Sequence, residues 1–63
     1  MSTHFLDIKG KIADLESILK EYESQLSIAE YNDNDTEIRR LTRLIEETEN
    51  KIEGMKNSPY YNG

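Results

Sequence analysis

The spacing of the apolar residues between positions 5 and 29 limits most strongly what this chain can fold into. Apolar side chains recur there at alternating intervals of three and four, the heptad pattern of a helix that packs one apolar face against a partner helix. This first stripe consists of Phe5, Ile8, Ile12, Leu15, Leu19, Tyr22, Leu26 and Ala29. With Phe5 at heptad position a, the pattern predicts a helix over about residues 3–31.

The pattern stops near Tyr31 and begins again in a different phase. Continued unchanged, it would place Asp33 and Arg40 in the apolar stripe, where burial of an unpaired charge costs several kcal/mol. For that reason, one long broken helix that pairs with copies of itself is the less favourable alternative. The second stripe predicts a helix over about residues 35–56 and consists of Ile38, Leu41, Ile45, Thr48, Ile52 and Met55.

Polar residues separate the two stripes. The segment at residues 32–35, Asn-Asp-Asn-Asp, has short side chains that bind nearby backbone groups and favour turns and helix caps. Asn34 and Glu37 have the spacing of a capping box for the second helix. Pro59 marks the end of that helix, because proline cannot continue it. A short loop favours antiparallel neighbours, so we expect an all-α fold: an antiparallel two-helix coiled-coil hairpin with a tail at residues 57–63, in a single domain of residues 1–63.

The antiparallel arrangement also predicts which residues face each other. Residues at heptad position e on one helix would face position e on the other, which sets Glu16 near Glu49 and Lys9 near Lys56. Such exposed like-charged pairs cost only a few tenths of a kcal/mol each. The predicted core layers are Ala29 with Ile38, Leu26 with Leu41, Tyr22 with Ile45, Leu19 with Thr48, Leu15 with Ile52, and Ile12 with Met55.

The chain is too short to be very stable alone. A domain of 63 residues buries only about 60% of the surface that its unfolded chain exposes, and the absence of cysteine rules out a disulfide. One flank of the hairpin is half apolar, because its g positions include Ile18, Gln25 and Leu44. We therefore expect these residues to form the interface between hairpins in a four-helix bundle, with the chain as its own partner in a homodimer or higher oligomer. The alternative is that Ile18 and Leu44 only widen the stripe of an ordinary amphipathic helix.

The opposite flank is acidic and is a candidate surface for binding another protein. Its e positions carry Glu16, Glu23, Glu30, Asp35 and Glu49. We expect this flank to be solvated or to face a basic surface. Tyr60 and Tyr61 in the tail are a second candidate, because the tail either covers the open end of the core or docks onto another protein.

A basic cluster interrupts this acidic chain at the start of the second helix. Guanidinium groups suit phosphate and carboxylate, so Arg39, Arg40 and Arg43 could hold a small anionic ligand, with Tyr31 beside them to stack on a base. The more ordinary interpretation is surface pairing with the acidic residues three or four positions away. These are Asp35, Glu37, Glu46 and Glu47.

Composition argues against several classes of function. Thirteen acidic and eight basic side chains give a net charge of −5, which opposes binding to nucleic acid. No segment approaches the ~18 apolar residues of a membrane span and no leader pattern is present, so we expect a cytoplasmic protein that does not enter the membrane. The single histidine, His4, has no cysteine to activate and stands alone, which argues against an enzyme. No metal or cofactor is expected, because the calcium-loop-like segment from Asp33 has Ile38 where glycine is needed and Leu44 where glutamate is needed.

Three functional hypotheses follow. The leading one is a non-enzymatic, self-associating helical hairpin that binds a macromolecular partner as a small accessory protein, or forms a minor part of a larger assembly such as a virus particle. The second is an oligomer that sequesters a small anionic, nucleotide-like ligand. The third is an acidic inhibitor that mimics nucleic acid, although its charge is modest.

Overall fold

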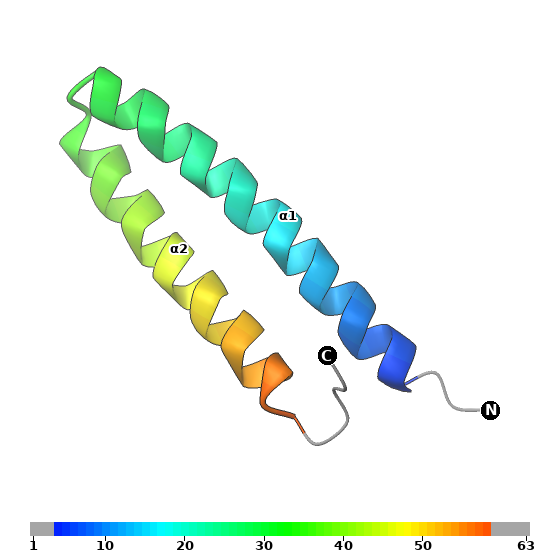
Figure 1. Ribbon diagram of the computed structural model, residues 1–63. Coiled ribbons are helices and arrows are strands. Elements are labelled where there is room, and N and C mark those ends of the chain that lie inside the picture. Colours follow the sequence, from blue (N-terminus) through cyan, green and yellow to red (C-terminus); the bar gives the residue numbers. More distant parts are fainter. Residues whose placement is uncertain (1–3, 59–63) are drawn as a thin grey trace.

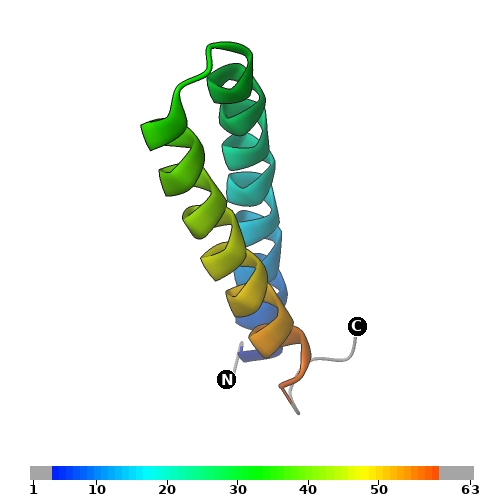
Figure 2. The same ribbon diagram turned by 90° about the vertical axis from the view of Figure 1, so that its left-hand side faces the viewer.

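Two helices of the computed structural model lie side by side and run in opposite directions (Figure 1). Helix α1 spans His4–Tyr31 and helix α2 spans Asp35–Lys56. The structure describes residues 4–58, and it describes side chains from residue 8 onward. The helices stay together along the length of α2, as the view turned by 90° also shows (Figure 2), in a rod of 49 × 16 × 15 Å. The prediction of an all-α antiparallel hairpin is confirmed for these residues.

The two predicted apolar stripes face each other and form the core. Every stripe residue whose side chain is described is buried or half-buried, while most residues outside the stripes are exposed. Leu41 has no exposed surface at all, so the core is tightest on this side chain, near the turn. A hairpin of two helices has a core only one layer deep, and the buried residues are accordingly few: Ile12, Ala29, Leu41, Thr48 and Ile52.

Thr48 is the one polar residue among these buried side chains. Its hydroxyl donates a hydrogen bond of 2.7 Å to the backbone carbonyl of Leu44, one turn earlier in α2. This bond satisfies the hydroxyl within its own helix, so burial leaves no polar atom without a partner. The second stripe therefore tolerates threonine at a core position.

Two surface grooves show how the helices are aligned. Leu19 and Ile52 line one groove between the helices, and Leu15 and Met55 line another on the opposite flank. The two residues of each pair come from adjacent predicted layers. This is expected in a coiled coil, where a side chain of one helix packs into a hole formed by residues of two layers on the other. The alignment thus agrees with the antiparallel register expected from the stripes.

The turn is built around Asp33, which has a positive φ of 54°. Its N–H donates to the carbonyl of Glu30 at 3.2 Å, and the N–H of Asn34 donates to the carbonyl of Ala29 at 2.9 Å. These two bonds form the Schellman motif that ends many helices, with the residue in the left-handed conformation normally a glycine. An aspartate occupies that position here, at a cost that glycine would avoid.

Asn34 ends this motif and also begins α2. Its side-chain Oδ1 accepts a hydrogen bond of 3.3 Å from the backbone N–H of Glu37, which is the first half of the predicted capping box. The second half, a bond from the Glu37 carboxylate back to the N–H of Asn34, was predicted wrongly. The N–H of Asn34 donates instead to the carbonyl of Ala29, and the Glu37 carboxylate accepts a hydrogen bond from Arg40.

Candidate interaction surfaces

One flank of the hairpin exposes apolar side chains. Ile18 is 39% exposed and Ile28 is 62% exposed, whereas Leu44 is half-buried beside the stripe and Gln25 is exposed. We call these four residues the apolar flank. The heptad pattern predicts Ile18, Gln25 and Leu44 on this flank but not Ile28, which lies outside the g positions. The available signal was its spacing, because a residue three positions after Gln25 is its neighbour on the helix surface.

Charged residues of both signs border the apolar flank. Toward the open end of the rod, a shallow and mainly apolar hollow is lined by Lys11, Asp14, Leu15, Lys51 and Met55. Toward the turn lies the ion pair of Glu37 and Arg40. The flank is therefore apolar in its middle and electrically balanced at its margins.

Glu37 and Arg40 form a bidentate ion pair on the exposed surface of α2. Arg40 donates from Nε to Oε1 at 2.6 Å and from Nη2 to Oε2 at 2.9 Å. The hydrogen bond from Arg40 lowers the pKa of Glu37 below its usual value, and the same bond and charge raise the pKa of Arg40.

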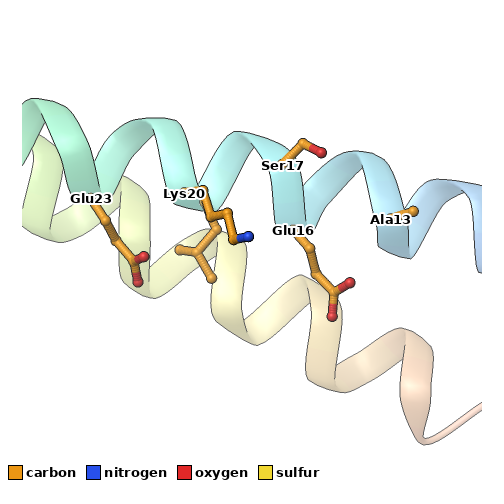
Figure 3. A pocket seen from close by; sticks show the side chains of 6 residues that line it. Ala13, Glu16, Ser17, Lys20 and Glu23 are labelled. Atoms are coloured by element: carbon orange, nitrogen blue, oxygen red, sulfur yellow. The ribbon is translucent and has the colours of Figure 1, made fainter.

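The acidic flank has the residues expected of it, together with two lysines. Glu16, Glu23, Glu30, Asp35 and Glu49 are all exposed. Lys20 lies between Glu16 and Glu23 on the outer surface of α1 (Figure 3). Lys56 forms an ion pair of 3.5 Å with Glu16. Positive charge is thus interspersed along this flank.

Lys56, which the sequence set near Lys9, lies beside Glu16 on the acidic flank. Glu16 and Glu49 do line the same groove, as the register required, but Lys56 lines it too and binds Glu16. The pair forms because both residues line this groove, and the long lysine side chain reaches along it to Glu16. Both side chains are about half exposed, so the pair adds little stability.

The arginine cluster lies on the exposed outer face at the start of α2. Thr36, Arg39, Arg40 and Arg43 line a shallow hollow there. Among residues 4–58, Arg40 is paired with Glu37, whereas no carboxylate lies within 4.0 Å of Arg39 or Arg43. The surface pairing expected from the sequence is therefore right for Arg40 and wrong for the other two.

Tyr31 is not part of this hollow. It is 89% exposed at the end of α1 and does not line the surface formed by the arginines. Tyr60 and Tyr61, the other aromatic residues named from the sequence, lie outside the described residues.

Within residues 4–58, no three His, Cys, Asp or Glu side chains gather where they could hold a metal ion. Neither described helix is long and apolar enough to cross a membrane. The surfaces above are open grooves and flanks on a rod.

No family model matches this chain, and it matches no curated protein and no solved structure.

Proposed function

We propose that this chain is a non-enzymatic interaction protein that associates with itself through the apolar flank and binds a macromolecular partner through the acidic flank. The observation that carries the proposal is the exposure of Ile18 and Ile28 on one flank of the hairpin. Exposed isoleucines lose contact with water when a second hairpin covers them, at about 25 cal/mol per Å² of apolar area removed. A hairpin with a core one layer deep gains more from this contact than a large domain would.

The acidic flank is suited to a different kind of partner. Its carboxylates are exposed, and a second copy of the same flank would bring like charges together. A basic surface of another protein suits it better. Such a hairpin would work as a small accessory protein or as a minor part of a larger assembly in the cytoplasm.

Sedimentation tests the self-association directly. The wild-type chain should sediment as a dimer or larger species, and the pair of substitutions Ile18→Glu and Ile28→Glu should reduce it to a monomer that keeps its helical circular dichroism. A matched control adds the same two charges on the outer face of α1, at the exposed residues Ser17 and Ser24. A wild-type monomer, or equal loss of association in the control, would contradict the proposal.

A second candidate function is the binding of a small anion, and it is favoured by two arginines that have no carboxylate within 4.0 Å among the described residues. Arg39 and Arg43 are four residues apart on an exposed helix face, which suits two guanidinium groups to one phosphate. Addition of inorganic phosphate, and then of a nucleoside monophosphate, should shift the amide resonances of residues 36–43. The variant with Arg39→Gln and Arg43→Gln should lose this shift, while Lys9→Gln with Lys20→Gln should retain it.

Native mass spectrometry of the protein purified from cells separates the two candidates. A co-purifying protein supports the interaction function, and a bound small molecule of matching mass supports the anion-binding function.

A further inference from the structure

We propose that two hairpins associate across the apolar flank in an antiparallel sense, about a two-fold axis at Leu44 that crosses the rods at right angles. In this dimer, Ile18 packs on Ile28 of the partner subunit, and Leu44 packs on its own copy. The inference rests on the proposed self-association and adds its direction and register.

The positions of the three apolar side chains along the rod support this axis. Ile18 and Ile28 are ten residues apart on α1, or about 15 Å. Leu15 shares a hollow with both Lys51 and Met55, and counting back from them along α2 places Leu44 level with residues 22–26 of α1. Leu44 therefore lies about midway between the two isoleucines. A two-fold axis at that level exchanges Ile18 and Ile28, so both exposed isoleucines meet an apolar side chain.

The charges along α2 have the same symmetry. Glu37, Leu44 and Lys51 occupy successive g positions, seven residues apart. An axis at Leu44 therefore sets each Glu37 opposite Lys51 of the partner subunit, about 10.5 Å to either side of the centre. The Glu37 side chain is still 38% exposed beside Arg40, and its carboxylate can accept further hydrogen bonds.

The other symmetric arrangement is less favourable. A two-fold axis along the rod would set α1 against α2 of the partner at the same level, because such an axis does not exchange the ends of the rod. Ile28 would then face the ion pair of Glu37 and Arg40, and Lys51 would approach Lys11 near the open end. An exposed isoleucine would cover a charged pair in that arrangement, and like charges would meet.

Contact between the acidic flanks of two copies is unfavourable, because it brings like charges together. The apolar flank is therefore the face for a second copy. Five carboxylates are exposed on the acidic flank, whereas the g positions of α2 on the apolar flank carry Glu37 on one side of Leu44 and Lys51 on the other. A second copy thus complements the apolar flank in both hydrophobicity and charge.

Disulfide trapping tests the arrangement, because the chain has no cysteine of its own. Leu44→Cys alone should form a disulfide-linked dimer rapidly under mild oxidation, since a residue on the axis meets its own copy. A mixture of Ile18→Cys and Ile28→Cys, one carrying a mass tag, should form the mixed disulfide in preference to either homodimer. Disulfides need Cα atoms within about 7 Å, so these pairings are specific to the register.

The outcomes separate the arrangement from the function on which it rests. If the wild type sediments as a monomer, self-association and this arrangement both fail. If it sediments as a dimer but Gln25→Cys links preferentially to Leu44→Cys, which the axis along the rod sets at the same level, only the arrangement is overturned.

A charge exchange gives a second, independent readout in the dimer. Glu37→Lys alone and Lys51→Glu alone should each weaken dimerisation severalfold, because each places like charges on both sides of the axis. The double variant should recover most of the wild-type association. Additive weakening in the double variant would overturn the proposed register.

Discussion

The two flanks of the hairpin border the same core but are suited to different contacts. On the apolar flank, Ile18 and Ile28 expose hydrocarbon that gains from being covered. On the acidic flank, the exposed carboxylates would lose hydration on contact with an apolar surface. The core stripe therefore decides that the chain forms a hairpin, while the residues beside the stripe decide what each side of the hairpin can contact.

The largest effect should come from the stripe that both flanks share. Leu41→Ala removes the side chain with no exposed surface, and such a truncation costs about 2–5 kcal/mol. A domain of this size has little more stability than that. Urea denaturation followed by circular dichroism should show near-complete loss of the folded baseline.

The control for this prediction is Ile28→Ala, measured at dilution. Because Ile28 is 62% exposed on the hairpin, its truncation should change the free energy of unfolding by less than about 0.5 kcal/mol. Equal losses in the two variants would mean that the core does not lie where the stripes place it.

A smaller effect, on the concentration dependence of the melting temperature, should distinguish the apolar flank from the acidic flank. If the apolar flank is the contact between copies, the melting temperature of the wild type should rise with protein concentration. Ile18→Glu with Ile28→Glu should abolish that dependence, and Glu23→Gln with Glu30→Gln, on the acidic flank, should preserve it. Melting curves across a hundredfold range of concentration would decide. A dependence that is lost only in the acidic-flank variant would reverse the assignment of the two flanks.

The turn between the helices belongs to neither flank. A substitution that stabilises the turn should therefore leave the contrast between the apolar and acidic flanks unchanged. Asp33 has a φ of 54°, and Asp33→Gly should stabilise the hairpin by about 1 kcal/mol because glycine adopts this conformation without strain. For a domain of this size, that corresponds to a rise in melting temperature of about 4–8 °C. Asp33→Ala is the matched control and should lower it.

The smallest effect concerns the ion pair beside the apolar flank. Arg40 holds the pKa of the Glu37 carboxyl below its ordinary value of 4.5. The pair's contribution is therefore fully present above about pH 4.5 and is lost as the pH falls through the lowered pKa. Carboxyl resonances of Glu37 followed by NMR should titrate below the ordinary value, and Arg40→Gln should return the midpoint toward it. An unchanged midpoint in Arg40→Gln would mean that the bond does not persist in solution.

Local patterns predicted the hairpin well and the contacts at its surface poorly. The break after Tyr31 and the four turn residues were enough to place the turn, because they depend only on helix periodicity and on short polar side chains. The left-handed conformation of Asp33 was not predicted. Four consecutive Asn and Asp residues all tolerate turn conformations, and the hydrogen bonds to Glu30 and Ala29 select one of them.

The surface residues show the same division. Glu37 has both Asn34 and Arg40 within reach, and sequence spacing allowed either contact for its carboxylate, whereas the structure pairs the carboxylate with Arg40. Ile28 was overlooked because it stands outside the heptad positions that border the core. Only side-chain positions reveal that Arg39 and Arg43 have no ion pair with another residue in the described part of the chain.

The amino-acid sequence by itself determined the two stripes, the break between them and therefore an antiparallel pair of helices, because each of these depends on residue spacing along one chain. The tertiary structure alone decided that Lys56 binds Glu16, that Asp33 takes the strained position in the turn, and that Ile18 and Ile28 remain exposed on one flank. The physical reason is that several polar groups lie within reach of each long side chain. Which of them it contacts depends on the relative height and rotation of the two packed helices. A shift of about one helical turn between the helices changes the group that is within reach.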